Sequence, residues 1–93
     1  MENIISSVWI FNSSNGRFSG GVFTNRSIAE EWIKSNRLTG ILTLYPVNEG
    51  VYQWAIKNGF FSPSKEKESS SDFIGAFSTA SQEHYHYIDG ELG

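Results

Sequence analysis

The chain has 93 residues, a net charge of −3 with neutral histidines, no cysteine, and 39% hydrophobic residues. This length corresponds to one small domain, and we expect residues 1–93 to form it. The lack of cysteine excludes disulfides and cysteine-based zinc sites. The acidic balance argues against nucleic acid as the ligand, because phosphate binding needs a basic surface, but it suits a basic protein partner.

The N-terminal stretch, MENIISSVWIF, differs from a secretory signal peptide. Glu2 stands where a signal peptide needs a basic residue, and Ser6 and Ser7 interrupt the apolar run. No apolar stretch approaches the roughly 20 residues that a membrane span needs. We therefore expect a soluble cytoplasmic protein that does not associate with membranes.

The first predicted elements form a β-hairpin from Ser7 to Thr24. Its first strand, SVWIF, is rich in β-branched and aromatic residues, and NSSNG from Asn12 to Gly16 is typical of a turn. RFSGGVFT, from Arg17 to Thr24, is the expected return strand. Its adjacent glycines, Gly20 and Gly21, indicate a bulge or a close approach of another group to the backbone.

A helix is predicted next, from about Ile28 to Arg37, with Gly40 ending it. Ser27 and Glu30 fit the S-x-x-E capping box. Glu30 and Lys34 are expected to pair on the solvent side. The predicted apolar stripe consists of Ile28, Ala29, Trp32 and Ile33. Trp32 is therefore expected to be buried, and Trp9 and Trp54 are interpreted as core residues in the same way.

The second half of the chain alternates apolar and polar segments. Ile41–Tyr45 is almost continuously apolar, which is typical of a central strand covered on both faces. A shorter helix is predicted from about Glu49 to Asn58, and Phe61–Asp72 is expected to be an exposed, mobile loop. FIGAF, residues 73–77, fits a strand or a helical turn, and the last strand is predicted at Glu83–Ile88. This order predicts an α+β two-layer sandwich, with a mostly antiparallel sheet and two helices.

The stretch EHYHYIDG, which begins at Glu83, holds both histidines of the chain. On a strand, His84 and His86 would lie on one face, with Tyr85 and Tyr87 on the other. Two histidines at this spacing can chelate a metal, but the chain has no further histidine and no cysteine as a third ligand. We therefore expect neither metal nor cofactor. The remaining interpretations are a half-exposed strand with hydrogen-bonded imidazoles, or a face that binds a partner.

Several motifs are similar to those of a family of small bacterial domains of unknown function. They are VWIF, GVF, AEEWI, LTGILTLYPV, YQWA and, near the end, HYHYIDG, and together they span nearly the whole chain. The resemblance implies a fold but little chemistry. In its size, acidity and expected location the chain also resembles immunity proteins of bacterial toxin systems, including contact-dependent growth inhibition.

Enzymatic motifs are missing from the sequence. It has no phosphate-binding loop, no G-x-G-x-x-G and no G-x-S-x-G, so we do not expect an enzyme. The preferred hypothesis is an immunity-type protein that blocks the active site of a cationic toxin domain, such as a nuclease. The alternative is a small-ligand or metal-binding module using His84 and His86. The predicted partner-binding residues are Glu66, Glu68, Asp72, Glu83, Tyr85, Tyr87, Asp89 and Glu91.

Overall fold

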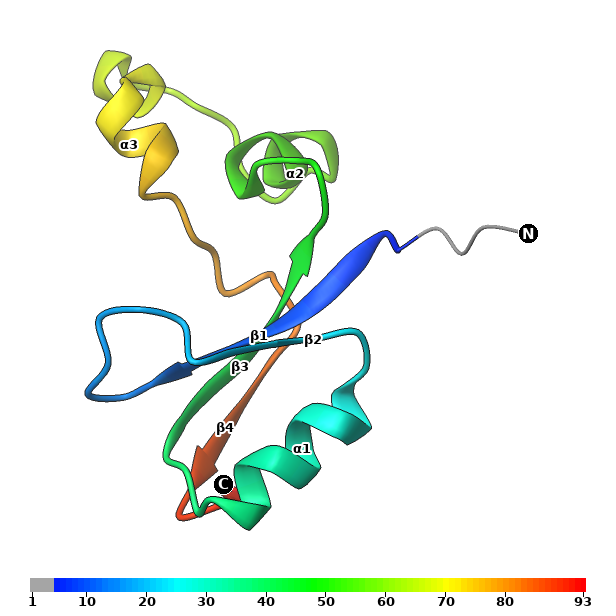
Figure 1. The fold of residues 1–93 in the computed structure, drawn as a ribbon. Coiled ribbons are helices and arrows are strands. Elements are labelled where there is room, and N and C mark those ends of the chain that lie inside the picture. Colours follow the sequence, from blue (N-terminus) through cyan, green and yellow to red (C-terminus); the bar gives the residue numbers. More distant parts are fainter. Residues whose placement is uncertain (1–4) are drawn as a thin grey trace.

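The computed structural model describes residues 5–93, which form a five-stranded antiparallel sheet, two main helices and one short helix (Figure 1). The α+β class predicted from the sequence is confirmed. None of the helices in the described residues has both the length and the apolar character needed to cross a bilayer. The elements, in chain order, are β1 (Ser7–Ser13), β2 (Gly21–Phe23), α1 (Arg26–Ser35), β3 (Gly40–Pro46), α2 (Val51–Lys57), the 3-10 helix η1 (Glu66–Ser69), α3 (Ser71–Gly75), β4 (His84–Ile88) and β5 (Glu91–Leu92).

The sheet has the strand order β2-β1-β3-β4-β5, and α1 packs against one of its faces. Residues that pair across antiparallel strands point to the same side, as Trp9 and Leu44 do. The main core lies between this face and the helix. It consists of Trp9, Phe11, Ala29, Ile33, Leu42 and Tyr87.

On the opposite face of the sheet, no helix of residues 5–93 packs. Ile10, Thr43 and His84 lie side by side on it, since Ile10 pairs with Thr43 and Thr43 with His84. Ile41, at the centre of the sheet, is 37% exposed. The prediction that both faces of β3 are covered is therefore wrong. A run of apolar residues shows that both faces of a strand are hydrophobic, but it does not show which elements pack against them.

The hairpin of β1 and β2 is shorter on its second strand than predicted. The return strand begins at Gly21, and the segment 14–20 forms a loop that carries an exposed Phe18. The close approach predicted at the glycines is confirmed: a Cβ atom at Gly21 would lie 2.7 Å from the ring of Phe23 and 3.5 Å from that of Trp32. The backbone there must stay bare so that both rings can pack over it.

The helix α1 begins two residues earlier than the capping box predicts. Asn25 is the N-cap residue, and its side chain accepts a hydrogen bond from the backbone of Ile28 at 2.9 Å. Ser27 therefore lies inside the first turn, because asparagine caps as well as serine does and comes earlier in the chain. Ile28 is 53% exposed, so it is not part of the buried stripe. Trp32 is only partly buried, which corrects the expectation that it is fully buried.

The C-terminal end of α1 also differs from the prediction. Arg37 follows the helix with a φ of 53°, and the backbone N–H of Leu38 donates to the carbonyl of Ile33 at 3.0 Å. This pattern is a Schellman motif with arginine in the left-handed position that glycine usually takes. Gly40 has a different role, because it begins β3. A Cβ there would lie 2.2 Å from the carbonyl oxygen of Asn12.

The segment predicted to be an exposed, mobile loop, Phe61–Asp72, is mostly exposed, but it contains the 3-10 helix η1 and the start of α3. Residues 51–77, which we call the aromatic lobe, comprise α2, η1 and α3 and lie beyond the end of β3 (Figure 1). Tyr52 contacts the rings of Phe61, Phe73 and Phe77 at centroid distances of 5.8, 6.2 and 5.5 Å. Its hydroxyl donates to the carbonyl of Glu68 at 2.8 Å. Tyr52 therefore holds residues on both sides of the polar segment: Phe61 before it, and Phe73 and Phe77 after it. The composition of the segment itself does not indicate these contacts.

The lobe makes the molecule flat and extended. The described residues span 44 × 40 × 20 Å, with a radius of gyration of 14.8 Å. A compact domain of this length has a radius of gyration of about 12 Å. The difference arises because the aromatic lobe continues from the end of the sheet rather than packing over a face of it.

Candidate functional site

The last strand has the two faces that its alternation predicts. His84 and His86 pair with Thr43 and Ile41 on the uncovered face of the sheet. Tyr85 pairs with Leu42 on the face that packs against α1. The tyrosines and the histidines of this strand therefore belong to opposite surfaces, and one flat partner surface cannot use both.

Tyr87 is part of the core and is only 3% exposed. Its hydroxyl donates to the carboxylate of Glu30, which also accepts a hydrogen bond from Nε of Arg26 at 3.1 Å. Burial and the hydrogen bond to Glu30 raise the pKa of Tyr87 to about 12. Glu30 consequently pairs with Arg26 rather than with Lys34 on the solvent side as predicted. The prediction that Tyr87 contacts a partner is therefore wrong, because a partner cannot reach this side chain in the folded domain.

Tyr85 is half-buried and connects α1 to the edge of the covered face. Its ring lies 5.9 Å from that of Trp9, and the guanidinium of Arg26 lies 3.5 Å from its centroid. Its hydroxyl donates to the carboxylate of Glu83, and this hydrogen bond raises the pKa of Tyr85. Glu83 is thus held in place by a side chain that is itself packed on two sides.

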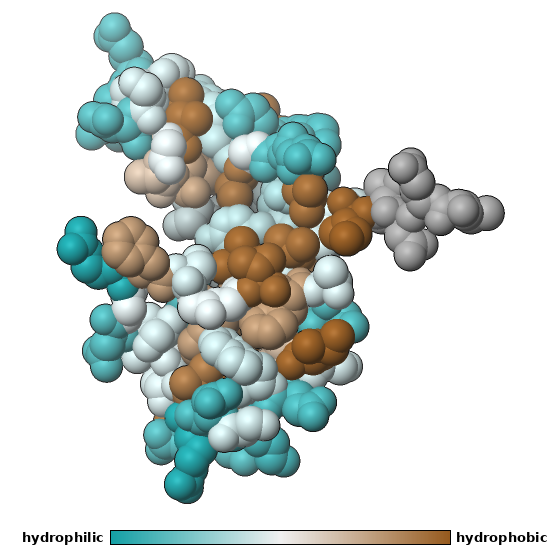
Figure 2. All heavy atoms as spheres, viewed as in Figure 1, coloured by the Kyte–Doolittle hydropathy of each residue, from teal (hydrophilic) through white to brown (hydrophobic). Residues whose placement is uncertain are grey.

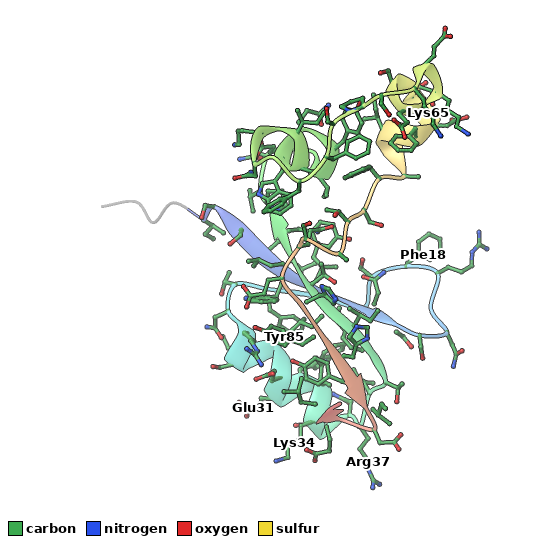
Figure 3. All side chains as sticks on the ribbon, turned by 180° about the vertical axis from the view of Figure 1, so that it is seen from behind. Phe18, Glu31, Lys34, Arg37, Lys65 and Tyr85 are labelled. Atoms are coloured by element: carbon green, nitrogen blue, oxygen red, sulfur yellow. The ribbon has the colours of Figure 1, made fainter. Side chains whose placement is uncertain are left out.

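The predicted acidic residues do not converge on one surface. Glu66, Glu68 and Asp72 lie in η1 and α3, at the end of the molecule that Lys65 marks in Figure 3. Asp89 and Glu91 lie at the turn between β4 and β5, and Glu83 directly precedes β4.

Glu68 has a local structural role in the aromatic lobe. Its carboxylate accepts hydrogen bonds from the backbone N–H groups of Ser64 and Lys65 at 2.8 and 3.1 Å. The bond from Ser64 is the main cause of a lowered pKa for Glu68. Such a carboxylate caps the start of η1, so removing it would disturb the lobe as well as any partner contact.

A cleft lies between α2 and the sheet, and we call it the α2 cleft. It has a volume of about 540 Å³, which falls in the range of ligand-binding pockets. Leu44 and Pro46 from β3 and Glu83 line it on the sheet side, and Trp54 and Lys57 line it from α2. Figure 2 shows hydrophobic residues gathered where the aromatic lobe meets the sheet.

Ionisable groups in the α2 cleft are unevenly paired. Nζ of Lys57 lies 3.0 Å from Oε2 of Glu49, which also lines the cleft. Glu83 takes part in neither of the two ion pairs found within residues 5–93. The carboxylate of Glu49 is therefore balanced by an ammonium group, while that of Glu83 is held, among residues 5–93, by the hydroxyl of Tyr85.

The histidines line a smaller cavity on the opposite side of the sheet. It has a volume of about 290 Å³, and Asn12, Thr43 and Thr79 contribute to its lining. The ring centroids of His84 and His86 are 5.4 Å apart, and Nδ1 of His84 lies 2.7 Å from the carbonyl oxygen of Gln82. Within the part of the chain that the structure describes, no group of three or more His, Cys, Asp or Glu side chains is placed to hold a metal ion.

Two features of this region were missed by the sequence interpretation. Trp54 was assigned to the core, but it is half-buried at the cleft, where its ring packs on that of Phe60 at 5.4 Å. The Asp89–Gly90 pair has φ angles of 49° and 88° and turns the chain into β5. Such a pair is a known signal for a two-residue hairpin turn, so the sequence did contain the information for β5.

The fold and these two cavities define a small α+β domain with one open sheet face and a cleft beside its second helix. The chain belongs to a family described as a domain of unknown function, DUF7710, whose model matches residues 8–93. The membership in a family of unknown function that the motifs indicated is thereby confirmed. No curated protein and no solved structure matches the chain.

Proposed function

We propose that the protein acts by stoichiometric association with another protein, without turnover, and that the α2 cleft is the centre of the contact surface. The cleft carries this proposal, because it brings together an apolar floor, a half-buried tryptophan and a carboxylate that has no cationic partner within residues 5–93. Contacts that dominate binding energy gather in concave, partly apolar sites of this kind.

The partner in this proposal is a cationic toxin domain, such as a nuclease, whose active site the protein covers in the cytoplasm. The net charge of −3 supports a basic partner, since opposite charge raises the rate of encounter. Proteins that neutralise a toxin in contact-dependent growth inhibition would act in this way. Of the predicted contact residues, Glu83 lies inside the cleft and Tyr85 supports it.

The test starts from capture of the partner in the native host, followed by reconstitution from purified components. We expect a 1:1 complex by light scattering and a titration of toxin activity that ends at equimolar protein. Glu83→Lys should weaken the complex, whereas Glu66→Lys, the same charge reversal in the aromatic lobe, should change it little. Toxin activity that persists at a large excess of the protein would overturn the proposal.

The cavity on the open face favours a second candidate, a small-ligand or metal-binding module. Both histidines line this cavity, although its volume of about 290 Å³ is at the lower limit for a ligand site. A zinc titration followed by NMR separates the two candidates. Saturable shifts of both imidazoles at micromolar zinc, lost in His86→Ala, would favour the second.

A further inference from the structure

We infer that the α2 cleft receives a basic side chain, arginine or lysine, from the protein partner, with its alkyl stem over Leu44 and Trp54 and its charged end at Glu83. This inference rests on the proposed function and adds the chemistry of the group that is recognised. Three observations support it: the arrangement of apolar and charged groups in the cleft, the carboxylate of Glu83 without an ion-pair partner in residues 5–93, and the exposed apolar side chains at the rim.

The lining matches a side chain that is apolar along its length and charged at its end. Leu44 and Pro46 provide an apolar floor, and Trp54 stands opposite on α2. Arginine and lysine bury their methylene stems against such surfaces while the charged end reaches a polar group. An aromatic wall further favours a cation over a neutral side chain.

The charge of the cleft selects a cation. Its lining contains the carboxylates of Glu49 and Glu83 and the ammonium group of Lys57. Lys57 pairs with Glu49, and Glu83 has no ion-pair partner within residues 5–93. The hydroxyl of Tyr85 occupies one acceptor position of Glu83. A carboxylate has about four such positions, so a guanidinium or ammonium group can still bind.

The rim of the cleft indicates that this cation belongs to a protein. Ile5, which lines the cleft, is 49% exposed, and Phe60, which packs on Trp54, is 50% exposed. A free small cation would leave these side chains in water. A protein surface that inserts one basic side chain can cover them, which is the arrangement of an anchor residue surrounded by apolar contacts.

The first experiment uses two dipeptides, acetyl-Arg-Arg-amide and its citrulline analogue, which has nearly the same shape without the charge. We expect the arginine peptide to shift the indole N–H signal of Trp54 in a ¹⁵N NMR titration, and the citrulline peptide not to. Glu83→Gln should weaken binding of the arginine peptide about five-fold, as expected when an exposed charge-assisted hydrogen bond is replaced by a neutral one. Glu66→Gln, the matched control outside the cleft, should leave its binding unchanged.

Equal shifts with both peptides, or unchanged binding in Glu83→Gln, would overturn the inference. The second experiment measures the dissociation constant of the purified partner. A 1:1 complex that Glu83→Gln does not weaken would refute the basic anchor while the proposed function stands. Selective binding of the arginine peptide without any complex of the partner would instead refute the proposed function and leave the cation site supported.

Discussion

Replacing Tyr87 by phenylalanine tests whether the hydrogen-bond network that joins Tyr87, Glu30 and Arg26 stabilises the fold. The substitution keeps the ring in the core and removes only the hydroxyl that donates to Glu30. A hydrogen bond to a charged group contributes about 1.5–3 kcal/mol. Glu30 keeps its pairing with Arg26, so we expect the variant to lose about 1–2 kcal/mol at neutral pH. A domain of this size has a free energy of unfolding of about 5–14 kcal/mol, so the loss is measurable by urea denaturation.

The same substitution makes a prediction for alkaline pH. The pKa of Tyr87 is about 12 in the folded protein, whereas an unfolded tyrosine has a pKa of about 10. A raised pKa in the folded state means that the stabilisation is fully present below about pH 10 and is lost as the pH rises toward 12. The difference in unfolding free energy between the wild type and Tyr87→Phe should therefore shrink between pH 9 and pH 11.

Tyr45→Phe is the matched control, because Tyr45 lies on the open face and its hydroxyl forms no hydrogen bond within residues 5–93. Its stability relative to the wild type should stay nearly constant over this pH range. If Tyr87→Phe also shows a constant difference, or a loss below about 0.5 kcal/mol at pH 8, the network does not stabilise the fold as argued.

Three further substitutions test other parts of the fold. Trp32→Ala should lower the melting temperature and cost about 2–4 kcal/mol, less than a fully buried tryptophan, because its ring is only partly buried against Phe11 and Phe23. Gly40→Ala should cost about 2–3 kcal/mol and speed hydrogen exchange where β1 and β3 meet, since the new Cβ would lie 2.2 Å from a backbone oxygen. Glu68→Gln should speed amide exchange over residues 64–69. The wild type should approach the variant as the pH falls below about 4, because the stabilisation by a carboxylate of lowered pKa is lost on acidification.

The fold class could be predicted from the sequence because its signals are local. SVWIF is rich in β-branched and aromatic residues, and alternate residues of HYHYI differ in type, as is typical of strands. In the segment from Ser27 to Lys34 the apolar residues recur with helical spacing. The boundary of α1 was misplaced because Asn25 and Ser27 are both good caps, and only the packed structure selects between them. The order of the aromatic lobe could not be predicted, since it depends on Tyr52 and Phe77 meeting across 25 positions of the chain.

The candidate site was predicted only in part. Period-two alternation separated the tyrosines from the histidines correctly. It could not show which face α1 would cover, and so Tyr87 was placed on a partner surface instead of in the core. The α2 cleft lay outside any local pattern, because Leu44, Trp54 and Glu83 come from three separate segments. Only the path of the chain between β3 and β4 brings them together.

The position of the α1 cap also determines which contacts connect the core to the α2 cleft. Because Asn25 caps the helix, Arg26 lies in the first turn, four residues before Glu30. From there its guanidinium group contacts Glu30 on one side and the ring of Tyr85 on the other, and Tyr85 holds Glu83. A helix that began at Ile28 would leave Arg26 outside its first turn and Glu83 without this support. The carboxylate to which we assign recognition of a basic side chain is therefore oriented by the same arginine that pairs with Glu30, the half-buried acceptor of the Tyr87 hydroxyl.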